Sequence, residues 1–532
     1  MSQSASRNQW GSRLGIILAV MGSAVGLGNF LRFPGLAAKY EGGTFMIPYF
    51  IAFLLLGLPI AYIEWAMARY GGNRGYHSAP GIFRIIWPHK ISPYLGTLGL
   101  IVPIGIYIFY VLIESWCLYY AYGFLTGALD LGRDSKAYAD FFSNFTGSQS
   151  DGLLFSFVSP ALVSLLVCVF LNFLFIYRGV QGIEIVSKWG MPILLTIAVI
   201  VLIRVMTLGT PNPAYPERNV INGLGFLWNP DPHGKGLLKS LMNSQMWLEA
   251  AGQIFFSLSV GFGVIINYAS YMKKKEDLML SATTSAAGNE FAEVALGGLI
   301  TVPAAFIFLG AGGIGDGTFN LGFVTMPVVF AHMPLGNLFG FLWFFLLFIA
   351  AITSSVSMLQ PGIAFIEEAH ATTRRTSVAL LLTITLIGSL FIVYFSKGLK
   401  ALDVMNFWVG TFFIFVLATV QVIVAGWLFG LENILKEAQE GSRIKIPKFL
   451  GFIIKYVCPT YLLIVFSAWC WQEFPKQWTA LKNDTITQLT VGFIILLFAL
   501  FLWLTSFAIK RWNASEAESC PLPQHAPSGD HQ

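Results

Sequence analysis

Twelve long apolar segments follow one another along the chain, separated by polar connections. A helix needs about 20 mainly apolar residues to cross a bilayer, and each segment has that length. We therefore predict an all-α membrane protein. Its spans are expected near 13–38, 43–70, 92–125, 157–177, 187–207, 243–269, 280–310, 338–368, 376–395, 401–428, 450–473 and 487–510.

The composition supports a protein that uses lipid as its solvent. Of the 532 residues, 56% are hydrophobic and 11% are charged, whereas a soluble domain carries roughly 25% charged residues. The apolar segments run almost from end to end, which favours one membrane domain over 13–511. We expect residues 1–12 to form a cytoplasmic segment and the polar residues 512–532 to form a disordered cytoplasmic tail.

Basic residues predict the orientation, because short cytoplasmic loops carry an excess of Lys and Arg. With twelve spans and the N-terminus inside, the short basic connections all fall on the cytoplasmic side. They contain Arg69, Arg74, Arg84, Lys90, Arg178, Lys188, Lys273, Lys274, Lys275, Arg374, Arg375, Lys436, Arg443, Lys445, Lys448, Lys510 and Arg511. We predict a multi-pass protein of the plasma (inner) membrane with both termini in the cytoplasm.

Glycine and serine residues interrupt two of the spans near mid-depth. They are Gly22, Gly26 and Gly28 in the first span and Ser257, Ser259, Gly261 and Gly263 in the sixth. Each Gly weakens a helix by about 1 kcal/mol relative to Ala. Small residues also serve helix packing in membranes, but matched interruptions five spans apart favour two unwound helices in an inverted repeat. The repeats would cover 13–207 and 243–428, with two further helices over 450–510.

Several motifs give the chain a specific resemblance. They are AVGLGNFLRFP (24–34), GGTFMIPY (42–49), YVLIESW (110–116), GQIFFSLSVGFG (252–263), NEFAEV (289–294), FLWFFLLFIAAITSS (341–355) and NFWVGT (406–411). In this order they resemble the neurotransmitter:sodium symporter family, and its bacterial LeuT-like amino acid transporters above all. The resemblance implies a LeuT-like fold of 12 transmembrane helices with a 5+5 inverted repeat and unwound first and sixth helices.

The resemblance also implies two sodium sites built from oxygen ligands, as a hard cation requires. The first site would use the Ala24 carbonyl, the side chains of Asn29 and Asn289, the Ser257 hydroxyl and the substrate carboxylate. The second site would use the carbonyls of Gly22, Val25 and Ala350 with the hydroxyls of Thr353 and Ser354.

By the same resemblance, the substrate would lie between the two unwound segments. Its carboxylate would meet the Leu27–Gly28 backbone and the Tyr110 hydroxyl, and its amino group would meet carbonyls near Ala24 and Phe256. The remaining pocket residues would be Ser23, Ile106, Ser257, Ser259, Phe262, Ser354 and Met358. Gly26 stands where monoamine-transporting relatives have an aspartate, so the substrate should bring its own carboxylate. We expect a hydrophobic or aromatic amino acid.

Glu293 and the gate residues complete the implied machinery. Glu293 stands where chloride-dependent relatives bind chloride, which predicts chloride-independent transport and leaves proton countertransport open. The implied inner gate is the pair Arg7–Glu368, supported by Trp10, Ser270 and Tyr271. At the implied outer gate, Arg32 faces Asn406 in place of the usual acid. We expect either a weaker gate, because an Arg–Asn hydrogen bond lacks the second charge, or one that uses Asp403, which lies one helical turn away.

The sequence as a whole predicts a sodium-coupled amino acid symporter that binds two Na⁺ ions. A proton-coupled carrier of the same fold and a non-transporting receptor are the alternatives. An enzyme is not expected, because the chain has only seven His and no zinc-type His/Cys spacing or nucleophile–base pattern. Expected partners are the amino acid, sodium and the lipid bilayer, with no nucleic acid; a homodimer stays open.

Overall fold

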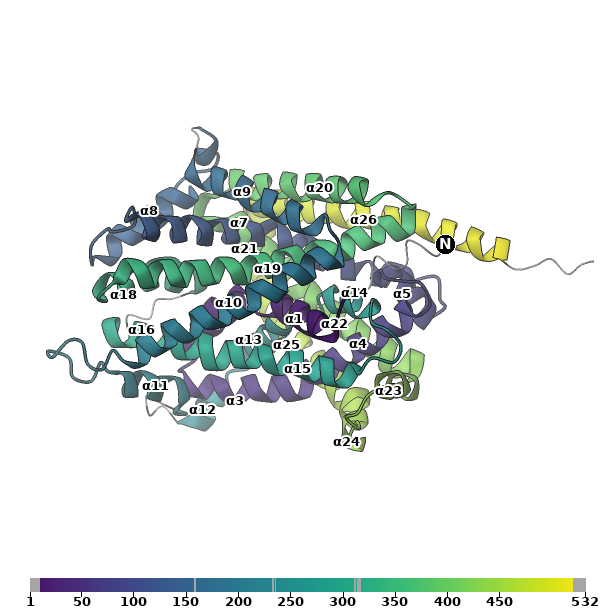
Figure 1. The fold of residues 1–532 in the computed structure, drawn as a ribbon, viewed down its shortest axis with the longest axis horizontal. Coiled ribbons are helices and arrows are strands. Elements are labelled where there is room, and N and C mark those ends of the chain that lie inside the picture. Colours follow the sequence, from purple (N-terminus) through teal and green to yellow (C-terminus); the bar gives the residue numbers. More distant parts are fainter. Residues whose placement is uncertain are drawn as a thin grey trace, which may run out of the picture.

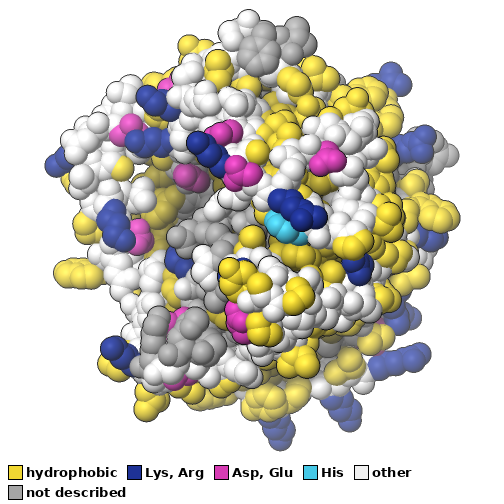
Figure 2. Space-filling view, turned by 90° about the vertical axis from the view of Figure 1, so that its left-hand side faces the viewer, with side chains coloured by type: hydrophobic (Ala, Val, Ile, Leu, Met, Phe, Trp, Pro, Cys, Tyr) yellow, Lys and Arg dark blue, Asp and Glu magenta, His cyan; other side chains and the backbone are white. Residues whose placement is uncertain are grey.

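The computed structural model describes residues 10–156, 159–231, 234, 236–310, 312 and 317–519, and every regular element within these ranges is helical. Long helices run side by side along the molecule (Figure 1). One end carries α8 (Ser135–Thr146) and α11 (Val220–Trp228), and the opposite end carries α5 (Ala79–Ile86) and α23 (Leu431–Gln439). Lys, Arg, Asp and Glu side chains gather on the α8 end (Figure 2).

Nine helical runs in the described ranges are long and apolar enough to cross a membrane. They are α3 (Gly43–Ala52) with α4 (Leu58–Gly72); α6 (Ser92–Gly96) with α7 (Leu98–Thr126); α10 (Val180–Met206); α15 (Leu278–Glu290) with α16 (Leu299–Leu309); α19 (Gly336–His370); α20 (Arg374–Tyr394); α21 (Lys400–Phe407) with α22 (Ile414–Ile423) and α23; α24 (Lys448–Phe452) with α25 (Cys458–Asn483); and α26 (Thr485–Ser519).

The other three predicted spans are a short helix and two broken ones. α9 (Pro160–Ile176) has 17 residues and begins with Pro160 behind an N-cap serine, Ser159. The first span consists of α1 (Arg13–Ala24) and, after a bend of 47°, a helical run over Gly28–Lys39 that ends as α2 (Phe33–Lys39). The multi-span helical fold expected from the sequence is therefore confirmed.

The sixth span is broken by left-handed backbone. α13 (Ser244–Leu258) ends before Ser259, and α14 (Val264–Ser270) begins after Gly263. Between them, Ser259, Gly261 and Gly263 have φ values of +55°, +68° and +87°. A Cβ atom on Gly263 would lie 2.1 Å from the Gly99 carbonyl oxygen of α7, so only glycine fits at this position.

α1 lies at the centre of the molecule, packed against α10, α15 and α19 (Figure 1). α7 packs along α19 and completes the surroundings of both breaks. The interrupted helices are therefore enclosed by continuous ones, and their freed peptide groups face protein rather than the lipid-facing surface.

The last helix is longer than the sequence predicts. α26 continues to Ser519, so residues 512–519 are helical, although they belong to the expected disordered tail. The reason is local: Ala514, Glu516, Ala517 and Glu518 are good helix formers, and the polar composition of the segment does not oppose helix formation. Residues 520–532 of the expected tail lie outside the described residues.

Candidate functional site

The break in the first helix turns backbone N–H groups toward a tyrosine of α7. The Leu27 N–H donates to the Tyr110 hydroxyl oxygen at 3.1 Å, and the Gly26 N–H donates to Asn29 Oδ1 at 2.8 Å. A Cβ atom on Gly26 would lie 2.7 Å from Tyr110 Oη and 2.9 Å from Ser354 Oγ. Glycine at position 26 therefore leaves both hydroxyl groups facing the break.

The residues implied for the first sodium site lie together. Asn29 Nδ2 lies 2.9 Å from the Asn289 side-chain amide, which in turn lies 3.4 Å from Ser257 Oγ. With its amide turned to donate, Asn289 is 3.2 Å from the Ala24 carbonyl oxygen. The side chains of Asn29, Asn289 and Ser257 are almost fully buried. Oxygen atoms from both breaks and from α15 thus meet at one point.

The residues implied for the second sodium site meet where α1 crosses α19. Ser354 Oγ lies 3.2 Å from the Gly22 carbonyl oxygen and 3.0 Å from that of Ala350, and Thr353 Oγ1 lies 3.1 Å from the Ala350 carbonyl oxygen. Val25 is the buried C-cap of α1. The two hydroxyls donate back along their own helix, which leaves their oxygen lone pairs available to a cation.

The predicted substrate residues fall into two groups. Leu27, Gly28, Tyr110 and Phe256 line a cavity of about 360 Å³ that also reaches Arg32. The other predicted residues are buried around the breaks and do not line this cavity; they are Ser23, Ala24, Ile106, Ser257, Ser259, Phe262, Ser354 and Met358. The Phe256 and Phe262 rings meet edge to face, with their centroids 6.0 Å apart.

A chain of hydroxyl groups next to the breaks includes Ser357, which the sequence analysis did not identify. Ser357 Oγ lies 2.7 Å from Ser23 Oγ and donates to the Ser354 carbonyl oxygen at 2.6 Å. Ser259 Oγ lies 3.5 Å from Ser23 Oγ on the other side. Because Ser357 follows Ser354 by three residues on α19, helical spacing is the signal that could have placed it on the same face.

Glu293 adjoins the first cluster of oxygen atoms. Its Oε2 accepts from Asn29 Nδ2 at 3.2 Å, and its Oε1 accepts from Gln253 Nε2 at 2.7 Å. The Glu293 side chain is fully buried. Gln253, which the sequence analysis did not single out, also donates to the Gly28 carbonyl oxygen at 3.3 Å and so links Glu293 to the first break.

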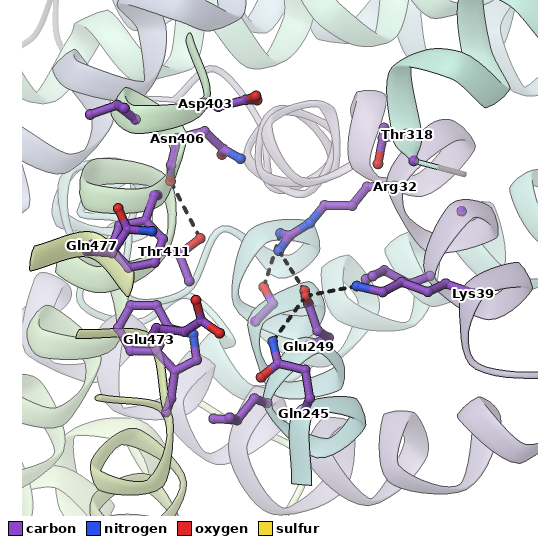
Figure 3. A pocket seen from close by; sticks show the side chains of 18 of the residues that line it. Arg32, Lys39, Gln245, Glu249, Thr318, Asp403, Asn406, Thr411, Glu473 and Gln477 are labelled. Carbon is purple, nitrogen blue, oxygen red and sulfur yellow. Dashed lines mark hydrogen bonds and ion pairs between the residues drawn. The ribbon is translucent and has the colours of Figure 1, made fainter. Parts of the chain in front are cut away.

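Arg32 has a different carboxylate partner from the one expected. Its Nη2 lies 3.9 Å from Glu249 Oε2 on α13. Within the described residues, neither Asp403 nor Asn406 is paired with Arg32; both lie on the opposite side of the cavity in Figure 3. In this conformation α13 brings a carboxylate closer to Arg32 than α21 does, and an outer gate formed with Asp403 or Asn406 stays a prediction.

A second cavity of about 560 Å³ continues from Arg32, Asp403 and Asn406 to Lys39 at the end of α2 (Figure 3). Lys39 precedes α3, and α3 packs against α11 at the α8 end of the molecule (Figure 1). Charged side chains of both signs line the second cavity, among them Lys39, Glu249, Lys400 and Glu473. These two cavities share their residues around Arg32, so together they lead from this end to Tyr110 and the first break.

The opposite end is closed by aromatic and polar contacts. Trp10 Nε1 donates to the Tyr268 carbonyl oxygen at 2.9 Å, and the His77 ring stacks on Tyr271 with the centroids 4.3 Å apart. Glu368 Oε2 accepts from the N–H groups of His77 and Ser78 at 2.7 and 2.9 Å. Burial lowers the pKa of His77, which lies between α4 and α5, to about 4.

The predicted inner ion pair cannot be placed. Arg7 lies outside the described residues, so the Arg7–Glu368 contact also lies outside them. Around His77, whose backbone N–H donates to Glu368, the structure places Tyr271, which stacks on the His77 ring, and Ser270, whose Oγ lies 2.9 Å from His77 Nδ1. Glu368 and Tyr271 therefore both contact His77, and their role in an inner gate stays a prediction.

Comparisons with known proteins agree with this architecture. The model of the "Sodium:neurotransmitter symporter family" matches residues 7–141 and 135–514. An uncharacterized sodium-dependent transporter of Methanocaldococcus jannaschii is 31% identical over 468 residues, which cover 86% of this chain and 89% of that protein. The sodium-dependent neutral amino acid transporter B(0)AT3 of Rattus norvegicus is 32% identical over 305 residues, covering 53% of this chain and 45% of the relative.

Among solved structures, MhsT in complex with L-phenylalanine superimposes with a TM-score of 0.73 at 28% identity, covering 86% of this chain and 99% of MhsT. The fold and the broken helices define a multi-pass membrane transporter with the LeuT-like fold. The chain belongs to the sodium:neurotransmitter symporter family. It is a sodium-dependent transporter and not an enzyme.

Proposed function

We propose that this protein is a symporter that couples the import of a hydrophobic or aromatic amino acid to two sodium ions. One observation carries the proposal: two buried groups of oxygen atoms flank a break in the first helix, and the Leu27 N–H and the Tyr110 hydroxyl meet at that break. Such a place offers donors to a carboxylate and oxygen ligands to cations.

The substrate class rests on the chemistry of the first break. No carboxylate stands at position 26 to pair with an amine, so the substrate supplies its own anion. Phe256, Phe262 and Met358 offer an apolar wall to the side chain. The similarity to MhsT, whose solved complex contains L-phenylalanine, and to a neutral amino acid transporter supports the same class.

Coupling follows from shared ligands. The substrate carboxylate would complete the shell of the sodium ion held by Ala24, Asn29, Ser257 and Asn289, so each raises the affinity for the other. The second sodium ion, held by Gly22, Val25, Ala350, Thr353 and Ser354, would join α1 to α19. Its loss on the inner side would release α1 and open the inner path.

The cavities support an outward-facing starting state. They lead from the α8 end to Tyr110 and Phe256, whereas Trp10, His77 and Tyr271 pack together at the other end. We place the α8 end outside and the termini in the cytoplasm of the plasma (inner) membrane, as the basic loops require. Substrate would close the outer path with Phe256 as its lid, and the two states would exchange through their different affinities for the ligands.

Glu293 takes the place of chloride in this proposal. Its buried carboxylate beside Asn29 supplies a fixed negative charge next to the first sodium position. Transport should then continue when chloride is replaced by gluconate. The complete burial of the Glu293 carboxylate is the observation that keeps the proton-coupled carrier as the second candidate, because an ionisable group inside a membrane is a candidate proton carrier.

The deciding experiment is uptake of radiolabelled amino acids by purified protein in sealed liposomes. We expect accumulation only with an inward sodium gradient, competition strongest from hydrophobic and aromatic amino acids, and no need for chloride. Uptake driven by a pH gradient without sodium would establish the proton-coupled carrier instead. Sodium-dependent binding without accumulation would establish a receptor.

A further inference from the structure

Glu249 holds Arg32 by a contact within one pair of neighbouring helices. Arg32 ends the π-helical turn Gly28–Arg32 that follows the first break, and Glu249 lies on α13, which precedes the break in the sixth span. Their closest N–O distance is 3.9 Å, and Arg32 Nη1 also donates to the Gly252 carbonyl oxygen at 3.5 Å. Figure 3 shows the Arg32 side chain directed toward Glu249.

This contact cannot close the cavity, because both of its members stand on the same side of it. Asp403 and Asn406 belong to α21 and lie across the cavity (Figure 3). Asp403 is exposed, and within the described residues no ion pair or hydrogen bond holds its carboxylate. The exposed carboxylate of Asp403 therefore lies across the cavity from Arg32, which is paired with Glu249 in this conformation.

Arg32 also rests on the residue that would cover the substrate. Its guanidinium carbon lies 5.2 Å from the centre of the Phe256 ring. Glu249 and Phe256 are seven residues apart on α13, which is two helical turns, so they share one face of that helix. A movement of Arg32 away from Glu249 must therefore also change the contacts of the Phe256 ring.

We propose that Arg32 is exchanged between two carboxylates: Glu249 holds it in the outward-facing state, and Asp403 receives it when the outer path closes. This rests on the proposed transport function. Glu249 is then a positioning residue that sets how often the path is open, and Asp403 is its competitor.

Lys39 lowers the free-energy cost of separating Arg32 from Glu249. Its Nζ lies 3.7 Å from Glu249 Oε1, so Glu249 keeps a cation after Arg32 has left. Gln245 Nε2 donates to the same oxygen at 3.4 Å. A partly buried carboxylate left without any partner would oppose the closed state, whereas here both carboxylates are paired once the path is closed.

The test measures access to the cavity and does not require transport. Ile113 lies one turn of α7 beyond Tyr110 and lines the cavity of about 360 Å³. It is replaced by cysteine in a variant whose five native cysteines have been changed to alanine. The rate of its reaction with a membrane-impermeant methanethiosulfonate is measured in sodium without substrate. The variants are Glu249→Gln, Glu249→Asp, Asp403→Asn and the double variant Glu249→Gln/Asp403→Asn.

Glu473→Gln is the matched control. Glu473 lines the cavity of about 560 Å³, but its carboxylate pairs with Lys476 on its own helix at 2.7 Å. We expect Glu249→Gln to slow the reaction at least threefold, Asp403→Asn to leave it as fast as in the parent or faster, and the double variant to fall between them. Glu249→Asp should restore most of the parent rate, and Glu473→Gln should match the parent.

Two results would overturn the exchange. One is a rate for Glu249→Gln equal to that of Glu473→Gln, and the other is a shift of Glu249→Gln and Asp403→Asn in the same direction. A variant that unfolds is recognised by its lowered melting temperature. If Glu249→Gln unfolds, the reaction rate of Glu249→Asp is compared with that of the parent, and we expect the two rates to be similar. Uptake by the unmodified protein tests the proposed function separately, since the thiol reaction reports only the opening of the path.

Discussion

Asn29 is the residue on which several parts of the site converge. Its Oδ1 accepts from the Gly26 N–H, and its Nδ2 lies 2.9 Å from the Asn289 amide and 3.2 Å from Glu293 Oε2. The side chain is fully buried. One amide group thus fixes the shape of the break and borders both the proposed sodium position and the fixed negative charge.

Replacing Asn29 by Ala should therefore weaken sodium and substrate binding together. Loss of a shared ligand reduces both affinities, since coupling between sites is reciprocal. We expect each to fall at least tenfold, about 1.4 kcal/mol, in equilibrium binding of labelled amino acid at varied sodium. Asn433→Ala, at an exposed position on α23, is the control. A large loss of one affinity with the other intact would contradict the shared site.

At the scale of residues, the sequence allowed the candidate site residues that lie within recognisable motifs to be identified. Asn29, Asn289 and Ser257 come together from three elements, as the resemblance implied. Glu249 was missed because its importance comes only from the side of α13 that faces Arg32. Ser357 could have been found from its spacing of three residues from Ser354, but its contact with Ser23, 334 positions away in the chain, could not. Contacts between distant segments need the fold before they can be identified.

At the scale of elements, the two breaks have different causes. The first helix ends at Ala24, and Val25 is extended with ψ 96°. The sixth span breaks through left-handed backbone at Ser259, Gly261 and Gly263. The second break is therefore imposed by backbone conformations that glycine adopts without strain, and it is held in place by the close approach of Gly99.

Gly263→Ala tests this account of the second break. The added Cβ would sit at φ +87° and 2.1 Å from the Gly99 carbonyl oxygen. Left-handed backbone alone costs a non-glycine residue on the order of 1–3 kcal/mol. We expect a lower melting temperature and lost sodium-dependent binding. Gly492→Ala on α26, where a Cβ would meet nothing within 4 Å, should keep both; equal effects of the two variants would refute the explanation.

The order of the elements was largely predictable because lipid selects long apolar helices. The predicted positions of the first and sixth breaks also agree with the structure, since clustered Gly and Ser oppose a continuous helix. The end of α26 was not predictable in the same way: a polar segment such as 512–519 can be a helix or a coil, and only local propensity distinguishes them.

At the scale of the whole molecule, the two ends of the predicted transport path are lined by different side chains. Around Arg32 the cavities are lined by charged side chains of both signs. At the other end, aromatic rings pack together, with His77 on Tyr271 and Trp10 against Tyr268. Charges respond to partners and salt, whereas a buried imidazole responds to protons. The protonation of His77 should therefore contribute a pH dependence at its end of the molecule.

The sign of this pH dependence follows from the direction of the His77 shift. Burial lowers its pKa from 6.5 to about 4, so the closed structure binds the proton more weakly than the unfolded chain does. Its contribution to stability is complete above about pH 6.5 and is lost as the pH falls through about 4. Since one pKa unit corresponds to about 1.4 kcal/mol, that contribution is on the order of 3 kcal/mol.

His77→Phe keeps a ring for Tyr271 and removes the titration, so it isolates this contribution. Other carboxylates also titrate on acidification, and the informative quantity is the difference in melting temperature between the unmodified protein and the variant, measured from pH 7.5 to pH 4.5. We expect the unmodified protein to lose more stability than the variant as the pH falls. The hydrogen bond to Ser270 is missing from the variant at every pH, so it shifts the difference by a constant amount. A difference that does not change with pH would show that the His77 imidazole is not kept neutral by burial.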